Sequence, residues 1–435
     1  MRSIHIHVRE GTRWTNWAGT ARTTPSRVLR PTTREQIAEA VTSVADDGGQ
    51  LKVTGSGHSF TGIAAATDVR LSLDGYRPTP IVDAANQRVT VAAGTRLREL
   101  NALLVRNGLA LPNLGDIDAQ TLAGATATGT HGTGAKLGGL ATGITGVWLV
   151  DGSGRQREYG AGDPELPGVA LGLGSLGVIT DLTIQCVPAF RLLAEEHPMP
   201  LDRAIADFDG LAESNDHLEF YWFPRADRVL VKRNNRAGDG QPLSRLRRWW
   251  DDEVMSNAVY GTVCRLGKTF PATVPTITSL SARLMASRTF MDESHRVFCT
   301  PRRVRFVEME YALPRAAFAS AFAALREAAS KRRVVFPVEV RVAAADELWL
   351  STAGGRDSVY FAVHQFQGMP YREYFAEVEA IMRDHDGRPH WGKLHTRTAE
   401  DLEPAYPRYA DFRALRDELD PDRLFANSYL DRVLG

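Results

Sequence analysis

Cysteine is scarce in this chain of 435 residues, and its three cysteines lie far apart in the sequence. They form no CxxC pair and no zinc-type spacing, which argues against both a disulfide framework and a metal centre. An excess of charge of either sign is also missing, because Lys plus Arg and Asp plus Glu each number 52. A chain without a basic surplus lacks the usual signature of nucleic-acid binding. We therefore expect no metal and no nucleic-acid partner.

Long apolar runs are absent as well. No stretch approaches the roughly 18 consecutive apolar residues that a membrane-spanning helix needs. The opening residues, MRSIHIHVREGTRW, contain no apolar region of the kind found in signal peptides. These absences predict a cytoplasmic protein without a membrane span, and the chain length fits two packed domains.

A glycine-containing turn, GSGHSF at residues 55–60, follows a predicted helix over 33–45 and a short apolar strand over 51–54. Gly55 and Gly57 permit a tight turn whose N–H groups can approach a phosphate. A Rossmann fingerprint would need a third glycine where this chain has Phe60, so that fold is not indicated. His58 follows the turn at once, either as a group bonded to a cofactor or as a loop residue satisfied by the backbone.

Two further stretches of small residues lie in the first 190 residues. Residues 111–139 are rich in Gly, Ala and Thr, and the segment LGLGSLGVIT at 171–180 leads into a predicted strand. Such segments can lie flat against an extended ligand, and their N–H groups can form anion-binding concavities. Three such stretches in one domain favour a large bound cofactor. His131, in GTHGTG, has the same two interpretations as His58.

The amino-acid composition of the sequence changes near residue 190. Beyond this point aromatic and charged residues increase, with predicted strands at 217–223 and 303–313 and a helix over 315–330. We expect a domain boundary here, and a surface loop or lid at 236–250. The stretch GTVCRLGKT at 261–269 imitates a P-loop, but its spacing has one residue too many to close around a phosphate.

Charged residues recur at strand spacing late in the chain. Glu339 and Arg341 alternate with three valines, so both charges should face a cavity while the valines face a core. His364 belongs to another strand-like run, and HWGKLH at 390–395 contributes Lys393 and His395. A lysine and an arginine in one cavity could stabilise a developing anion.

Together these motifs resemble one family. GSGHSF, NLGDIDAQTLAGATATGTHGTG, SLGVIT, EVR and RPHWGKLH occur in the order found in the aldonolactone oxidoreductases, which include L-gulono-1,4-lactone oxidases and dehydrogenases. This family belongs to the vanillyl-alcohol-oxidase type of flavoproteins and has the alditol oxidases as a sister group. The resemblance runs from TNWAG near residue 16 to the last residues.

The resemblance implies an α+β fold. A two-subdomain FAD-binding domain of the PCMH type would occupy residues 1–190. A substrate or cap domain with an antiparallel sheet flanked by helices would occupy 191–414, and residues 415–435 would return to the first domain. It also implies that FAD is bound, covalently through His58. The cofactor-binding positions it implies are Gly55, Ser56, Gly57, His58, Ser59, Gly115, Asp116, Gly124, Ala125, Thr128, Gly129, His131, Gly132, Gly177, Val178 and Ile179.

By the same resemblance, the catalytic set consists of Glu339, Arg341, Lys393 and His364, with Asp116 and His395 also near the substrate. Glu339 would orient substrate hydroxyls, while Arg341 and Lys393 would stabilise negative charge as a hydride passes to flavin N5. His364, His395 and water are the candidates for the base that takes the hydroxyl proton.

The resemblance also bears on the electron acceptor and the substrate. Gly115 matches a position where plant galactonolactone dehydrogenases carry alanine, so the smaller residue favours access of dioxygen and an oxidase. Alditol oxidases carry serine at the position of Asp116 and histidine at that of Ala362, so an aldono-1,4-lactone is the first expectation for the substrate. A sugar alcohol such as xylitol, or a related sugar-like intermediate, is the alternative.

Overall fold

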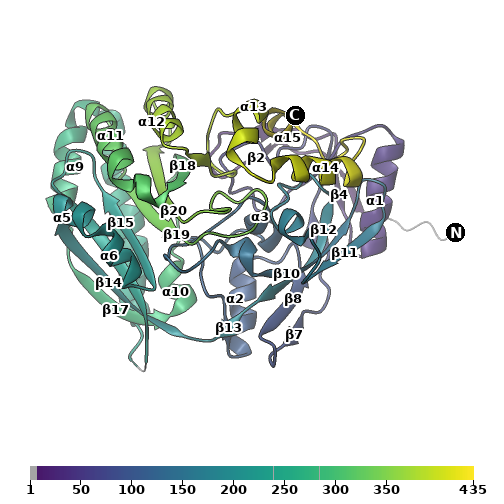
Figure 1. Cartoon of the computed structure of the whole chain (residues 1–435), viewed down its shortest axis with the longest axis horizontal. Coiled ribbons are helices and arrows are strands. Elements are labelled where there is room, and N and C mark those ends of the chain that lie inside the picture. The colour runs from purple at the N-terminus through teal and green to yellow at the C-terminus, as the bar shows by residue number, and fades with distance from the viewer. Residues whose placement is uncertain (1–6, 239, 284) are drawn as a thin grey trace.

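The computed structural model describes residues 7–238, 240–283 and 285–435, and its first long helix shows how local signals set the fold (Figure 1). Helix α1 (Arg34–Asp46) begins where the Thr33 side chain accepts a hydrogen bond from the Gln36 N–H at 3.2 Å. This side-chain cap satisfies one of the N–H groups that have no partner inside the helix. Ile37, Val41 and Val44 are fully buried on one face, as their spacing predicts.

Two sheets form the first part of the chain. The four-stranded sheet has the order β1 (His7–Glu10), β4 (Arg27–Arg30), β6 (Val69–Leu71) and β5 (Leu51–Val53). The five-stranded sheet is antiparallel throughout, with the order β11 (Gln156–Gly160), β10 (Ile144–Val150), β12 (Val178–Gln185), β8 (Arg88–Ala92) and β7 (Ile81–Asp83).

Short elements lie between the strands of this part. The helices are α2 (Leu97–Arg106), α3 (Leu122–Ala127) and α4 (Leu166–Ala170), with single 3₁₀ turns at Leu73–Gly75 and Leu140–Gly143. Two small strand pairs complete this part, namely β2 (Trp14–Thr15) with β3 (Arg22–Thr23), and β9 (Leu109–Ala110) with β13 (Val187–Pro188).

A single eight-stranded antiparallel sheet dominates the second part of the chain, on the left of Figure 1. Its order is β17 (Arg288–Glu293), β14 (Arg191–Pro200), β16 (Arg228–Ala237), β15 (His217–Trp222), β19 (Val338–Ala343), β20 (Ser358–Phe366), β18 (Phe306–Pro314) and β21 (Arg388–Pro389). The helices of this region are α5 (Leu201–Ala206), α6 (Phe208–Glu213), α7 (Arg245–Trp249), α8 (Tyr260–Thr269), α9 (Val274–Arg283), α10 (Ser294–Phe298), α11 (Phe318–Lys331) and α12 (Arg372–Asp384).

The two faces of this sheet have opposite character. Val338, Val340 and Val342 of β19 are fully buried in one core with side chains of α5, α6, α11 and α12. Each such valine contributes about 1.5–3 kcal/mol through burial. The intervening residues of β19, Glu339 and Arg341, therefore face the other way, because side chains alternate along a strand. The period-two pattern of the sequence is confirmed.

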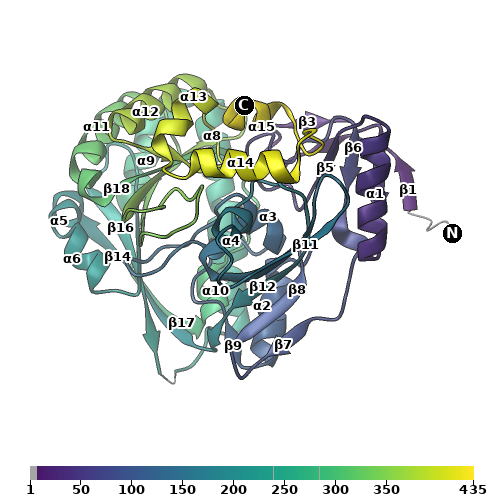
Figure 2. The same cartoon turned by 45° about the vertical axis from the view of Figure 1, so that its right-hand side comes forward.

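The end of the chain packs back on the first part. Helices α13 (Ala399–Leu402), α14 (Tyr409–Leu419) and α15 (Ser428–Leu434) run along one edge of the molecule in Figure 2. Trp391, Leu402 and Tyr409 share one core with residues of the five-stranded sheet, and the Leu51 N–H donates to the Leu424 carbonyl at 2.9 Å. We propose residues 1–190 as the first domain, rejoined by the chain near Trp391, earlier than the residue 415 expected from sequence.

Two predictions about local structure have clear outcomes. Residues 236–250 are not one loop, because they contain the end of β16 and all of α7, although large side chains there are exposed. The stretch 261–269 lies inside α8, so it forms no P-loop, as its spacing indicated. Within the described ranges, no helix has both the length and the apolar character needed to cross a bilayer.

Asn427 provides a test of how the C-terminal helix is held. Its side-chain amide donates to the carbonyls of Gly62, Ile63 and Ala65, each at 3.1 Å, while its oxygen caps α15 by accepting from the Leu430 N–H. We expect Asn427→Ala to lower the free energy of unfolding by about 2–4 kcal/mol, because buried carbonyls lose their partner and the helix loses its cap.

Chemical denaturation followed by tryptophan fluorescence measures this effect. Asn86→Ala is the matched control, since the Asn86 amide bonds only an exposed Asp83 carboxylate. Equal denaturation midpoints for Asn427→Ala and the control would contradict the prediction.

Candidate active site

Two adjoining cavities are present: the larger lies between the two parts of the molecule, and the smaller lies within the first part. The larger has a volume of about 500 Å³ and the smaller of about 120 Å³. Both are lined by His58, Ser59, Gln120 and Thr128, so together they form one continuous, angled space. An extended ligand could place one end in each cavity.

The GSGHSF turn forms the junction between the cavities. Gly57 has a φ of +69°, a conformation that favours glycine, and a Cβ on Gly55 would lie 2.5 Å from the Thr121 hydroxyl. The Gly57 carbonyl accepts from the Trp17 N–H at 2.8 Å, and the Phe60 N–H donates to the Gly392 carbonyl at 2.7 Å. These bonds fix the turn against the segment that carries Lys393.

The ring of His58 stands at the junction and forms no hydrogen bond with any described residue. It stacks on Trp17, with ring centroids 6.0 Å apart. Burial lowers the pKa of His58, and the charges of Arg96 and Lys393 lower it further. The imidazole is therefore neutral at physiological pH and keeps a lone pair, as a nucleophile or an acceptor requires.

The smaller cavity is lined mostly by small residues. Those predicted from the sequence and present in its wall are Gly55, Ser56, Gly57, His58, Ser59, Gly124, Thr128, Gly177 and Ile179. Gly94 and Gly174 add to the same wall, and Lys52 donates to the carbonyls of Gly174 and Phe425. Because the side chains are small, backbone N–H groups in this wall are accessible and can donate hydrogen bonds to a pyrophosphate. The wall therefore fits the dinucleotide part of FAD.

Four predicted cofactor positions lie outside both walls. Ala125 and Val178 belong to apolar cores, and Gly129 and Gly132 also line neither cavity. A Cβ on Gly132 would meet the Asn113 side chain at 2.1 Å, so close packing explains that glycine. These four therefore lie behind the cavity walls, and the expectation that they contact the cofactor stays a prediction.

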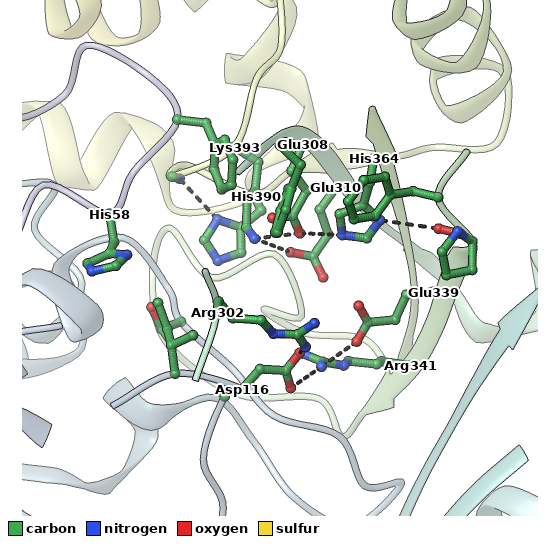
Figure 3. Close-up of a pocket in the computed structure, with 18 of the residues that line it drawn as sticks. His58, Asp116, Arg302, Glu308, Glu310, Glu339, Arg341, His364, His390 and Lys393 are labelled. Atoms are coloured by element: carbon green, nitrogen blue, oxygen red, sulfur yellow. Dashed lines mark hydrogen bonds and ion pairs between the residues drawn. The ribbon is translucent and has the colours of Figure 1, made fainter. Parts of the chain in front are cut away.

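A dense group of charges forms one side of the larger cavity. Arg341 of β19 pairs with Glu339 on its own strand, with Glu219 of β15 at 3.0 Å, and with Asp116 of the first domain. The other Asp116 oxygen accepts from Arg302 at 2.7 Å. Figure 3 shows Asp116, Arg302, Arg341 and Glu339 together along the lower side of this space.

The two carboxyl groups of this cluster titrate in opposite directions. Burial raises the pKa of Glu339 to about 7, and the charge of Arg341 opposes this rise only in part. Burial also opposes ionisation of Asp116, but Arg341, Arg302 and Lys232 outweigh it and hold the pKa of Asp116 well below its usual range. Glu339 can thus change protonation near neutral pH, whereas Asp116 stays ionised.

A second group of charges faces the first across the cavity. Lys393 lies 2.5 Å from Glu308 and 3.8 Å from Glu310, both on β18. His364 of β20 contacts the same Glu308 oxygen at 3.4 Å, and its other ring nitrogen faces the Pro337 carbonyl at 3.3 Å. Figure 3 shows this group on the upper side of the space, with His58 apart at one end.

The charges of this second group are also set by burial and pairing. Burial opposes the ionisation of Glu308, yet Lys393 and His364 lower the pKa of Glu308 to about 2. The same carboxylates raise the pKa of Lys393 above its usual value despite the cost of burial. Lys393 is therefore a fixed cation in the wall of the cavity.

His131 and His390 lie beside this group. His131 contacts Glu310 at 3.2 Å, and burial lowers the pKa of His390 to about 3. The donor atoms of His131, Glu310 and His390 lie within 4.8 Å of one another, which could suit a metal ion. The Lys393 ammonium lies 3.8 Å from Glu310, however, and its charge would repel a cation placed there.

The structure places one predicted substrate residue elsewhere. His395 lines neither cavity, and its Nε2 lies 3.0 Å from the Tyr429 hydroxyl of α15. Burial holds the pKa of His395 well below its usual range. His395 therefore packs in the core, outside both cavities, and the structure does not bring it together with the other predicted substrate residues. Glu339, Arg341, His364, Lys393, Gly115 and Asp116 all line the larger cavity.

Several lining residues were not predicted from the sequence. Glu308 and Glu310 show the same alternate spacing on an apolar strand as Glu339 and Arg341, so that signal could have found them. Tyr221 also lies on a strand, and its hydroxyl donates to Glu339 at 3.4 Å. Arg302 lies in an irregular segment, and Trp17 lies in the TNWAG stretch, for which no site role was predicted; the folded chain brings both to the cavity.

A glycine-walled cavity for a dinucleotide, joined to a charged cavity for a small polar molecule, defines a flavin-dependent oxidoreductase. Residues 25–160 match an FAD binding domain, and residues 182–433 match the D-arabinono-1,4-lactone oxidase family. The solved structure of a cholesterol oxidase from Brevibacterium sterolicum matches with a TM-score of 0.83 at 18% identity, covering 100% of this chain and 99% of that one. The fold is thus the α+β, PCMH-type FAD-binding fold with a cap domain.

Relatives of similar length place the chain within this class. The chain is 40% identical to L-gulono-1,4-lactone dehydrogenase of Mycobacterium tuberculosis, over 97% of this chain and 99% of the relative. It is 31% identical to bovine L-gulonolactone oxidase (98% and 99%) and 34% identical to a Streptomyces alditol oxidase (97% and 98%). The protein belongs to the aldonolactone oxidoreductase family and is an FAD-dependent oxidoreductase.

Proposed function

We propose that the protein oxidises a secondary hydroxyl group of an aldono-1,4-lactone similar to L-gulono-1,4-lactone. One observation carries this proposal: Glu339, Arg341 and Lys393 line the same cavity as His58, although they come from distant parts of the chain. Carboxylates accept hydrogen bonds from sugar hydroxyls, while guanidinium and ammonium groups donate to carbonyl and alkoxide oxygens. This set matches a small, uncharged, hydroxyl-rich substrate.

Each charged side chain has a defined task in this proposal. Arg341 is fixed by three carboxylates, so it can donate to a substrate oxygen without moving. Asp116 holds Arg341 and Arg302 in place, since each of its oxygens is already engaged by one of them. Lys393 supplies positive charge where negative charge develops. Bound FAD would accept a hydride from the substrate carbon at its N5 atom.

Glu339 is the residue we assign to accept the hydroxyl proton. Its pKa of about 7 lets it be ionised and still basic near neutral pH. His364, the candidate from sequence, is a poorer acceptor, because both of its ring nitrogens face acceptors, namely Glu308 and the Pro337 carbonyl. His364 would instead help to hold Glu308 against Lys393.

We assign dioxygen as the electron acceptor that reoxidises the flavin. Gly115 lines the larger cavity, and a Cβ at this position would lie 3.2 Å from the His131 carbonyl and 3.3 Å from the Thr130 methyl. Because a Cβ would be crowded by these two atoms, the cavity wall at residue 115 stays free of a side chain, and this favours an oxidase that produces hydrogen peroxide. The alternative is a dehydrogenase that uses another electron acceptor.

The cytoplasmic location expected from the sequence stays a prediction.

Sugar-alcohol oxidation is the second candidate, favoured by the similarity to an alditol oxidase. Ala362 stands opposite Glu339 on one neighbouring strand and opposite Glu310 on the other. Its methyl group offers a flexible polyol no hydrogen bond, whereas a compact lactone ring needs fewer contacts. For this reason we place the lactone first.

A substrate screen tests the proposal. Under anaerobic conditions, L-gulono-1,4-lactone should remove the flavin absorbance of the purified protein faster than xylitol does, because the rigid lactone suits the fixed charges. In air, the same lactone should generate peroxide faster than it reduces an added dye. Faster bleaching by xylitol would favour the polyol function, and no bleaching by either compound would refute both.

His58 provides a test of the flavin linkage. We propose that its neutral, unbonded ring forms the covalent link to FAD, so the yellow colour should survive acid precipitation of the wild-type protein. His58→Ala should release all of its flavin on precipitation, yet still bind FAD through the glycine-walled cavity. His131→Ala is the control and should keep acid-stable flavin. Release of all flavin from the wild-type protein would disprove the link.

The pKa of Glu339 predicts a pH dependence. A carboxyl group with a raised pKa is protonated below that value, so kcat/KM should rise with pH and level off above about 7. Glu339→Gln should lose this rise and lower kcat by roughly 10²–10⁴-fold. Glu308→Gln is the control, because Glu308 is ionised throughout this range, so the inflection near 7 should remain. A Glu339→Gln enzyme with an unchanged profile would rule out this assignment.

A further inference from the structure

Large apolar side chains are exposed together on one helical segment of the cap domain. Of the ten large hydrophobic residues exposed in the described part of the chain, eight lie between residues 246 and 280. They are Leu246, Trp249, Trp250, Met255, Val259, Leu266, Phe270 and Leu280, and Leu246 reaches 73% exposure. Such a concentration marks an interaction surface, since scattered single exposures are the norm.

Most of this segment, residues 245–269, is one continuous helix with small residues on its inward face and large residues on its outward face. Helix α7 passes into a π-helix (Trp250–Val259), which passes into α8, with helical backbone angles at both junctions. Gly261, Cys264 and Gly267 of α8 are buried against the body of the protein, while Leu266 and Phe270 point outward. Because the inward face is filled by small residues, the large outward residues are not an extension of the core.

The outward residues also follow the helical repeat. Leu246, Trp250 and Val259 lie four and nine residues apart, which fits a helix whose π-helical part has i→i+5 hydrogen bonds. Met255, between them, is exposed but also lines the larger cavity of the active site. Leu266 of α8 lies seven residues after Val259, the last residue of the π-helix, as one face of a helix requires, and Phe270 follows directly after α8. The segment therefore presents one apolar stripe, which we call the exposed stripe.

Positive charge accompanies the exposed stripe. Residues 244–283 contain six Lys or Arg residues and three Asp or Glu residues, in a chain whose overall charge is balanced. Beside α8 lies a groove of about 560 Å³ lined by Arg265, Arg303 and Arg305 and by Glu253, which pairs with Arg303 and leaves Arg265 and Arg305 as the basic surplus. Gly261 of α8 lines the same groove, so the basic groove and the exposed stripe adjoin.

We propose that the exposed stripe and its basic groove bind peripherally to a membrane surface that contains anionic lipids. Tryptophan beside arginine is typical of helices that lie in the interfacial layer, with apolar side chains among the acyl chains and cations at the headgroups. Lipid phosphates would neutralise the basic surplus. A second copy of this chain would instead bring two positive surfaces together, so self-association is disfavoured. This proposal does not depend on which substrate the enzyme oxidises.

Vesicle sedimentation with the full-length, FAD-loaded protein tests the proposal. The protein should sediment with vesicles of phosphatidylcholine and phosphatidylserine, more weakly with phosphatidylcholine alone, and less as salt is added. The combined variant Leu246→Ser, Trp249→Ser and Trp250→Ser should weaken binding by roughly tenfold or more. Its FAD content and turnover should stay unchanged, because these three residues line neither cavity of the active site.

Ile81→Ser is the matched control, since Ile81 is 66% exposed on β7 of the five-stranded sheet. This position is far in sequence from the helices that carry the exposed stripe. It should bind vesicles as the wild-type protein does. The proposal is overturned if the wild-type protein stays in solution with anionic vesicles, or if the control loses as much binding as the combined variant. It is also overturned if sedimentation velocity shows a dimer that the combined variant abolishes while no vesicle binding occurs.

Discussion

The arrangement of the active site depends on one buried guanidinium group. Arg341 is held by Glu219 and Glu339 of the large sheet and by Asp116 of the first domain, so it joins the two halves of the molecule at the cavity. Burying so many charges is costly, and they are tolerated because cations and carboxylates alternate throughout the cluster. Loss of the guanidinium would leave three carboxylates close together without compensation. The same contacts that tie the domains together thus keep the substrate-binding charges fixed.

Two carboxyl groups of the cavity illustrate how environment divides similar residues into different tasks. Glu308 lies beside a lysine and remains charged, whereas burial, together with two carboxylates that compete for Arg341, raises the pKa of Glu339 to about 7. Groups whose pKa values are pushed apart in this way are those that an enzyme can use as a fixed anion and as a proton acceptor. The cavity therefore contains a permanent ion pair on one side and a titratable group on the other.

The sequence was sufficient where function follows a local repeat. The alternation of Glu339 and Arg341 with valines predicted both the core face and the cavity face, and the glycine turn predicted a cofactor wall. It was insufficient where the outcome depends on packing between distant segments. His395 lies only two residues from Lys393, yet it turns into the core to meet Tyr429, while Arg302 enters the cavity from an irregular segment. No spacing in the chain reports such tertiary contacts.

The alternation along β19 has a consequence for how this site can vary. Catalytic and core side chains are neighbours on one strand, so a shift of pairing by a single residue would exchange the two sets completely. Valines would then face the substrate cavity, and Glu339 and Arg341 would be buried in the apolar core on the other face of the sheet. An insertion or deletion within this strand would therefore move both sets of side chains to the wrong face. Diversity in substrate choice must arise by side-chain replacement on a backbone whose register is held constant.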